Sequence, residues 1–281
     1  AHYADLGGLY HYTLKQLAWH GRFRRAGLTA VLGIGAAPGI TNVLAAYGAS
    51  GLTRVEAVEI RIGAIDRSTY RRASALPGSY SLQTLLEECS WPPAVFRRGK
   101  TIFLAPFSGR EPYRFPAPVG RQKPQFTIHS ELATLPRTLR AREVFFKIAF
   151  DDEFVDKMQT LRQAGLLEPE NLPATLSILK RLPPAIPAAV EQHEVIQVLV
   201  RGREGSRPRR VLLEARVSAS GETVDKDTAA PASIVAQQLA RGEIARPGVY
   251  PPESIVRPGP FFDELRRRGI FLYKNGRRLH P

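Results

Sequence analysis

A histidine and a glutamate two residues apart are the side chains in this sequence best suited to moving a proton. His129 and Glu131 lie in the stretch Thr127-Ile-His-Ser-Glu, whose alternation predicts a strand with both side chains on one face. An imidazole has a pKa near neutrality, so the pair can hold an ammonium group or transfer a proton. The alternative is a buried histidine beside a salt-bridged glutamate, the more frequent outcome for an isolated pair of this kind.

The glycine-rich stretch of residues 28–42 predicts a strand, a tight turn and a helix. Gly33, Gly35 and Gly39 permit the turn after an apolar run. Pro38 suits the first turn of the helix that follows. Such a turn presents free backbone N–H groups to a phosphate or carboxylate. The spacing nearly matches the dinucleotide motif G-x-G-x-x-G, but Pro38 replaces the third glycine, so a turn that only requires small residues is the alternative.

A second glycine-bearing strand end lies near the start of the chain. Asp5 and the pair Gly7-Gly8 follow a short strand pattern, and residues 11–23 then predict one helix. Both strand ends are expected on the same rim of a parallel sheet, where ligands bind. Residues 1–50 therefore predict the second half of a parallel βαβ domain without its first half.

From residue 54 onward the hydrophobic period changes to two, which predicts a mixed α+β sheet that includes a strand at residues 143–150. Residues 106–124 are rich in proline and are expected to form an ordered loop that covers the site as a lid. Thr228 is expected to cap a later helix, with free N–H groups at residues 228–233 that face a ligand.

These motifs resemble, in order, the saccharopine dehydrogenase-like reductases, a family that includes saccharopine reductase, lysine 6-dehydrogenase and carboxynorspermidine dehydrogenase. Besides the two glycine-bearing strand ends, three later segments carry the resemblance: Phe126-Thr-Ile-His129-Ser-Glu131-Leu-Ala-Thr134-Leu-Pro136, Thr228-Ala-Ala-Pro231-Ala-Ser-Ile234 and Arg246-Pro247-Gly248-Val249-Tyr250-Pro251-Pro252-Glu253. The resemblance covers nearly the whole chain. It implies the C-terminal part of a Rossmann-like α/β parallel sheet, followed by a mixed-sheet α+β domain for substrate binding and dimerisation.

The same resemblance implies an NAD(P)-dependent oxidoreductase that acts on the CH–NH group of an amino acid or a polyamine-like substrate. Its cofactor is NAD or NADP, and its expected assembly is a homodimer through the sheet of residues 54–217. The implied division is residues 1–50 for the remnant nucleotide domain, 51–222 for the substrate domain and 223–281 for returning helices. The family's nucleotide-binding opening is missing and the chain starts at Ala1, so an incomplete, inactive fragment with an exposed apolar sheet edge is expected.

The resemblance also implies roles for individual residues, with His129 and Glu131 as the catalytic pair. The implied cofactor-binding residues lie at the two strand ends: Asp5, Gly7, Gly8, Gly35, Pro38 and Gly39. The implied substrate-binding residues are Asn42, Tyr113, Arg114, Lys226 and Thr228. Asp5 has an alternative role as a helix cap or turn former, and Asn42 as an interhelical hydrogen-bonding group.

The composition excludes several other classes of protein. The 281 residues are 43% hydrophobic, which indicates a globular chain, and a single cysteine fits a cytoplasmic protein without disulfides. Neither a membrane span nor a metal site is predicted, because long apolar runs and paired histidine spacings are lacking. The net charge of +14 comes from scattered residues, mostly arginine, so nucleic-acid binding is the least favoured alternative, behind a non-catalytic scaffold module of the same fold.

Overall fold

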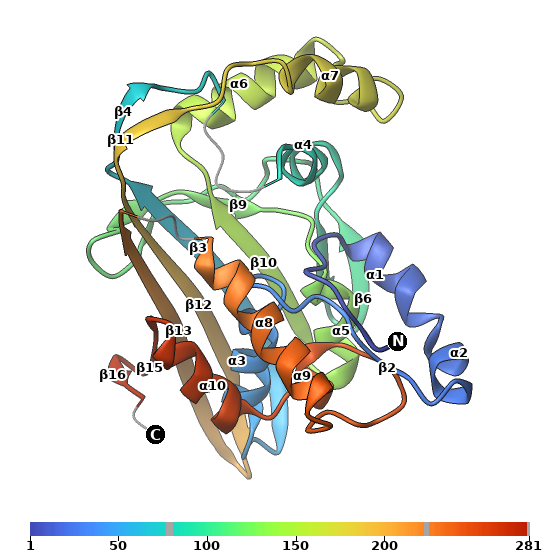
Figure 1. Cartoon of the computed structure of the whole chain (residues 1–281). Coiled ribbons are helices and arrows are strands. Elements are labelled where there is room, and N and C mark those ends of the chain that lie inside the picture. Colours follow the sequence, from blue (N-terminus) through green and yellow to red (C-terminus); the bar gives the residue numbers. More distant parts are fainter. Residues whose placement is uncertain (77–80, 222–224, 280–281) are drawn as a thin grey trace.

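The computed structural model describes residues 1–76, 81–221 and 225–279 of the chain. Figure 1 shows a long, twisted sheet with helices across its front and a much smaller sheet beside it, near the N-terminus. The expected domain boundary between residues 222 and 223 lies outside the described residues.

The small sheet is parallel and is completed by a strand from the far end of the chain. Its order is β1 (Tyr3–Ala4), β2 (Thr29–Val31) and β14 (Gly248–Tyr250). β1 forms its open edge, where the side chains of Tyr3 and Leu6 are 42% and 47% exposed. One large apolar side chain on β1 and one just after it are thus exposed.

The large sheet is mixed, as its period-two strands predict. Within the described residues it contains nine strands: β16 (Arg277–Arg278), β15 (Ile270–Lys274), β13 (Arg207–Ser220), β12 (Glu191–Glu204), β3 (Arg54–Asp66), β10 (Glu143–Ala149), β5 (Ala94–Arg97) and β6 (Lys100–Phe103) in order, with β9 (Pro124–Phe126) on β10. Only β3 and β10 run parallel among the neighbouring pairs of this described sheet. Two short ribbons lie outside it: β4 (Thr69–Arg72) with β11 (Ile186–Ala189), and β7 (Tyr113–Arg114) with β8 (Arg121–Gln122).

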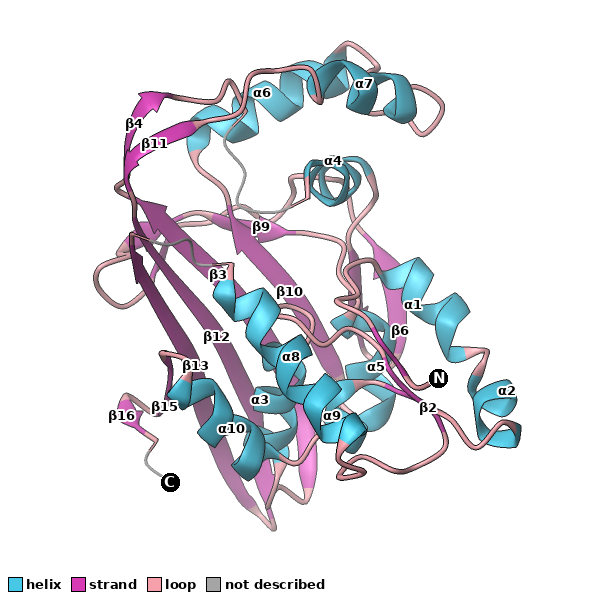
Figure 2. Cartoon of the chain, in the orientation of Figure 1, coloured by secondary structure: helices cyan, strands magenta, loops and turns pink. Residues whose placement is uncertain are grey.

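One face of the large sheet is covered by helices, and the main hydrophobic core lies between them (Figure 2). The covering helices are α3 (Ile40–Ala49), α5 (Glu131–Thr138), α8 (Lys226–Ala240), α9 (Pro252–Ile255) and α10 (Pro258–Arg267). Ile60, Phe146 and Val198 of the sheet are fully buried against Leu44 and Val235 of the helices. The helix of the small sheet, α3, thus belongs to the core of the large one, which ties the two sheets together.

The remaining helices form two smaller units. A satellite core around Leu86 and Met158 joins α4 (Leu82–Ser90), α6 (Asp152–Gln163) and α7 (Leu172–Leu179). The helix expected at residues 11–23 is instead two helices, α1 (Tyr10–Leu17) and α2 (His20–Arg25). Leu17 and Phe23 both pack on the same core of the small sheet. Because positions six apart point in different directions on one straight helix, the chain must bend between them.

Most of the loop of residues 106–124 does not form the expected lid, because it packs on the sheet face opposite the helices. Phe115 lies against Gly63, where an added Cβ would come within 2.6 Å of the ring. The buried Lys147 donates from Nζ to the backbone oxygen of Gly109 at 2.7 Å. The sheet therefore separates residues 109–119 of this loop from the helix-covered face, whereas Phe107 packs against the helices α4 and α6.

Candidate active site

The turn before α3 uses several of its N–H groups in hydrogen bonds of its own, which leaves fewer of them for a ligand than expected. Gly39, at φ +130°, precedes α3, and its N–H donates to Oδ1 of Asn42 at 3.0 Å. The N–H groups of Gly35 and Ile40 donate to the backbone oxygens of Pro38 and Gly35 at 2.7 and 2.9 Å. An anion bound by these three N–H groups would have to displace the hydrogen bonds that they already make.

Close packing explains why the turn requires small residues. Pro38 lies before α3 rather than in its first turn, because the helix begins at Ile40. An added Cβ on Gly33 would come within 2.7 Å of the Pro38 ring, and one on Gly7 within 2.9 Å of it. An added Cβ on Gly39 would lie only 2.0 Å from the oxygen of Gly35. The glycines thus serve contacts between the two strand ends within the chain.

Asp5 joins the two strand ends. Its Oδ1 accepts from the N–H of Gly33 at 2.6 Å, and its Oδ2 accepts from Nε2 of Gln16 at 2.6 Å and from the Tyr3 hydroxyl at 2.9 Å. Both carboxylate oxygens therefore have donors within the chain. The alternative role of Asp5 as a turn-forming residue is the one that this geometry supports.

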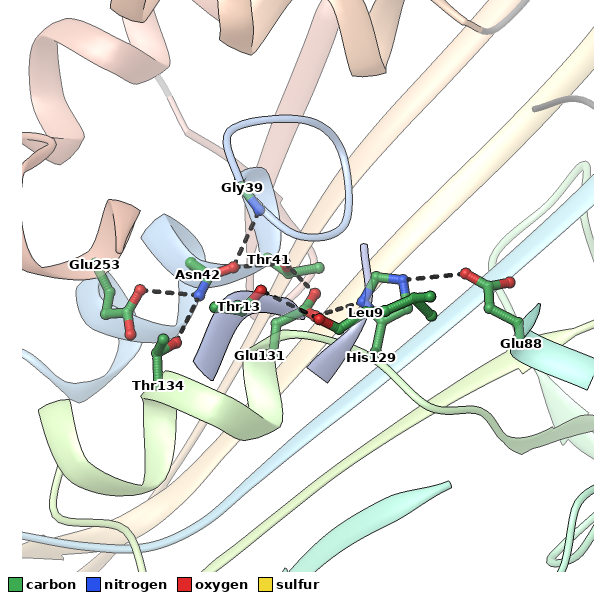
Figure 3. Close-up of polar contacts among 10 residues, drawn as sticks. All are labelled: Leu9, Thr13, Gly39, Thr41, Asn42, Glu88, His129, Glu131, Thr134 and Glu253. Carbon is green, nitrogen blue, oxygen red and sulfur yellow. Dashed lines mark hydrogen bonds and ion pairs between the residues drawn. The ribbon is translucent and has the colours of Figure 1, made fainter. Parts of the chain in front are cut away.

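His129 and Glu131 contact each other, but not as alternate residues of one strand. β9 ends at Phe126, and Glu131 is the first residue of α5. Nδ1 of His129 lies 2.5 Å from Oε2 of the fully buried Glu131, and Nε2 lies 3.6 Å from Oε1 of Glu88 (Figure 3). The imidazole stacks on Phe146, with 3.9 Å between ring centroids and 11° between the planes.

This environment makes His129 a buried cation. Burial alone would lower the pKa of its imidazole, but the charge and hydrogen bond of Glu131, together with Glu88, raise it to about 10. The expectation of a near-neutral imidazole is therefore wrong. At neutral pH the ring is an imidazolium between carboxylates and cannot accept a proton.

A second carboxylate network continues from this pair through α3. Oε1 of Glu131 accepts from Oγ1 of Thr41 at 2.6 Å. The next residue, Asn42, donates from Nδ2 to Oε2 of Glu253 at 2.8 Å, and to Oγ1 of Thr134 at 3.5 Å (Figure 3). Burial raises the pKa of Glu253. The amide of Asn42 thus makes the interhelical contacts that were its alternative role.

The other expected substrate-binding residues lie in two different parts of the structure. Thr228 lies beside the strand end of β2, since its Cγ2 is 3.4 Å from the position of a Cβ on Gly35. Thr228 does not cap α8, which begins two residues earlier at Lys226, and its N–H donates to the oxygen of Asp225. The expected free N–H groups at residues 228–233 are therefore wrong as well.

Tyr113 and Arg114 lie on the opposite side of the large sheet from His129. The Tyr113 hydroxyl donates to Oε1 of Gln197 at 2.8 Å, and Gln197 alternates with Ile196 and Val198, which face the helices. Arg114 is exposed on β7. The structure thus does not bring these two residues together with the candidate catalytic pair.

Three residues of the buried network were not predicted from the sequence, because their partners are distant in the chain. Glu88 belongs to α4, Thr41 to α3 and Glu253 to α9. Thr41 and Glu253 lie inside the segments that carry the family resemblance. Glu88 has only its place on a helix two residues after the buried Leu86 as a signal.

Metal-binding clusters and membrane-spanning helices are both absent from the described part of the chain. It contains no group of three or more His, Cys, Asp or Glu side chains arranged to hold a metal ion. None of its helices combines the length and apolar character needed to span a membrane.

The fold and site together define a mixed-sheet domain whose core helix comes from a small parallel sheet, with a buried ionic network where the two meet. Residues 35–270 match the family described as the saccharopine dehydrogenase C-terminal domain, and the chain belongs to this family. It is 26% identical to carboxynorspermidine synthase of Vibrio cholerae and 23% identical to that of Vibrio alginolyticus. Each match covers 91% of this chain and 64% of the relative, so the chain spans about two thirds of their length.

Solved structures share the fold at low sequence identity. Apo saccharopine dehydrogenase (L-Glu forming) from Saccharomyces cerevisiae superposes with a TM-score of 0.62 at 15% identity, covering 94% of this chain and 77% of that one. A homospermidine synthase from Legionella pneumophila in complex with NAD gives 0.67 at 13% identity, covering 98% and 71%. The predicted fold class, part of a Rossmann-like parallel sheet followed by a mixed-sheet domain, is confirmed.

Proposed function

We propose that this chain is the substrate-binding part of an NAD(P)-dependent oxidoreductase that acts on the CH–NH group of an amino acid or a polyamine-like substrate. The observation that carries the proposal is the contact of Thr41 with Glu131, because it fixes the glycine-bearing strand ends against the substrate domain. The family assignment and the polyamine synthases among the relatives support it. In such an enzyme the bound cofactor supplies the hydride, and the protein positions it against the substrate carbon.

The strand ends offer few groups to the phosphates of a dinucleotide. The N–H groups of Gly35 and Gly39 are engaged within the turn, and the carboxylate of Asp5 is occupied by three donors. We therefore propose that the phosphates of NAD or NADP bind to a part of the whole protein beyond these 281 residues. The rim formed by Gly7, Gly8 and Gly35 would then leave space for the cofactor without supplying a charged group to it.

His129 and Glu131 are proposed as positioning residues of this site. The imidazolium of His129 links α4, through Glu88, to α5, through Glu131. Glu131 in turn holds Thr41 one residue from Asn42 on α3. A rigid network of this kind keeps the substrate domain in register with the strand ends, which a hydride transfer over a short distance requires.

Two measurements test the proposal. Calorimetry on the 281-residue chain is expected to show at most millimolar affinity for NADH or NADPH, about −4 kcal/mol. The protein with its complete reading frame is expected to oxidise NADPH or NADH when offered an amine together with an aldehyde or keto acid. If no amine and carbonyl pair supports nicotinamide oxidation, the oxidoreductase assignment is wrong and a non-catalytic module of this fold takes its place. Micromolar cofactor binding by the chain alone would show that Gly33–Gly39 is itself the dinucleotide site.

A further inference from the structure

A pocket of about 210 Å³ lies between α10, the last turn of α3 and the strand β15. Its lining is mostly apolar, and Tyr47 of α3, Phe262 of α10 and Leu272 of β15 are among its walls. Figure 1 shows α10 beside β15, close to the C-terminus. A cavity of about 150 Å³ already accommodates a benzene ring, so this pocket has room for one aromatic ring with a small substituent.

The face of α10 that borders the pocket follows the period of the helix. Gly259, Phe262, Asp263 and Arg266 all line the pocket. They stand at positions i, i+3, i+4 and i+7, which lie on one face of a helix. Gly259 leaves this face open, because a Cβ added to it would meet no atom within 4 Å. The missing side chain of this glycine therefore contributes to the opening.

Two aromatic rings form adjoining walls of the pocket. The rings of Tyr47 and Phe262 are in edge-to-face contact, with 5.3 Å between their centroids and 84° between their planes. Both side chains are half-buried and pack on the main core, which fixes their positions. Aromatic rings attract each other in edge-to-face and offset arrangements beyond what the buried area alone provides. The walls thus favour a ligand that contains a ring.

Arg266 brings hydrogen-bond donors that the described chain does not satisfy. Its Nε is buried and has no acceptor within the described residues. Its Nη2 lies 3.9 Å from Oδ1 of Asp263, which is too far for a hydrogen bond. A buried donor without an acceptor is costly. The guanidinium therefore lacks an acceptor that a ligand in the pocket can supply.

Positive charge predominates around the pocket. Nζ of Lys274 lies 5.0 Å from the ring centroid of Tyr47, and among the described residues this lysine has no carboxylate partner. Arg278 also lines the pocket. Asp263 is the one acidic residue among the lining residues of the described structure. A negatively charged ligand therefore fits this setting better than a cation.

Solvation of surface charges explains only part of this arrangement. Exposed basic residues are usually solvated and their ion pairs contribute little to stability, which accounts for Lys274. It does not account for Arg266, whose Nε is buried without an acceptor beside a mostly apolar opening. A carboxylate matches the planar fork of a guanidinium and accepts two parallel hydrogen bonds from it.

We propose that this pocket binds a small aromatic carboxylate, with its ring against Tyr47 and Phe262 and its carboxylate on Arg266. These residues differ from those of the candidate active site. The two places are joined by α3, which carries Tyr47 near its end and Thr41 and Asn42 in its first turn. The ligand is therefore expected to bind whether or not the chain takes part in an oxidoreductase reaction.

Saturation-transfer NMR on the 281-residue chain tests the proposal with benzoate as the probe. Benzoate is expected to bind with a dissociation constant of about 1 mM or less. Benzamide has the same shape without the charge, and acetate has the charge without the ring. Each is expected to bind at least about tenfold more weakly. Absence of benzoate binding at about 10 mM, or equal binding of benzamide or acetate, would overturn the proposal.

Charge variants on α10 distinguish an anion site from a solvated surface. Arg266→Gln is expected to weaken benzoate binding at least about tenfold, because a charge-assisted pair is lost. Asp263→Asn is expected to tighten it, because a like charge is removed from the wall. The matched control is Arg267→Gln, which removes the exposed neighbour that pairs with Glu264, and it should leave the affinity unchanged. Equal effects of Arg266→Gln and Arg267→Gln would refute the site.

A variant that fills the pocket locates the bound ligand. Gly259→Leu places a side chain in the opening and is expected to abolish benzoate binding. The unfolding temperature is measured in parallel, because leucine before Pro260 fits a helical backbone less well than glycine does. Full affinity in a folded Gly259→Leu variant would show that benzoate binds elsewhere and would overturn the proposal. If this variant does not fold, the charge variants on α10 decide.

Discussion

The substitution Glu131→Gln tests the central feature of the site, a buried imidazolium held between carboxylates. The variant keeps the size of the side chain and leaves His129 with Glu88 alone, whose Oε1 is 3.6 Å away. Removing one partner of a buried ion pair typically costs about 3–5 kcal/mol of unfolding free energy. Because both residues are at most 5% exposed, we expect a loss in this range at pH 7.

The pH dependence of stability gives a sharper measurement. The ordinary pKa of a histidine is 6.5, and in the folded chain that of His129 is raised to about 10. Its contribution to stability is therefore complete below about pH 6.5 and disappears as the pH rises through about 10. Between these values the unfolding free energy should fall by about 1.4 kcal/mol per pH unit from this residue alone.

Urea denaturation of the original chain and the variant at pH 6.5, 8 and 9.5 measures this slope. The variant should lose most of the slope, because Glu131 supplies the largest attraction for the proton. Glu253→Gln is the control, since it also alters a buried carboxyl group of the network but does not contact the imidazole in the described structure. A Glu131→Gln variant that unfolds within about 1 kcal/mol of the original chain at pH 7, with the same slope, would refute the buried imidazolium.

Three further predictions follow from the fold. Gly39→Ala should destabilise the chain by more than about 2 kcal/mol in thermal or urea unfolding, because the new methyl group would lie 2.0 Å from the oxygen of Gly35; a stable variant would show that the turn can rearrange. Light scattering at micromolar concentration should show a symmetric dimer formed through the sheet of residues 54–217, and a monodisperse monomer would speak against that assembly. Fluorescence anisotropy should detect no tight binding to duplex DNA at about 150 mM salt, whereas sub-micromolar affinity for one sequence would revive nucleic-acid binding.

The local elements of this chain are determined by nearby residues. Asp151 caps α6 through the N–H of Phe154, and the alternating residues of β10 bury Val144 and Phe146 on one face. Caps and periods of two or 3.6 act within about ten residues, so they can be read directly from the sequence. The family resemblance likewise followed from short ordered motifs, and it predicted the two-sheet architecture.

Tertiary structure alone decided which distant groups meet. The strand β14 joins β2 across more than two hundred residues, and Asn42 bonds Glu253 at a separation of 211. The strand pattern around His129 was overridden because α5 begins at Glu131, where the carboxylate is held by Thr41 of another helix. The protonation of His129 depends on burial and on charges brought together only by packing. Burial and charge contacts between distant residues leave no pattern in any single stretch of the sequence.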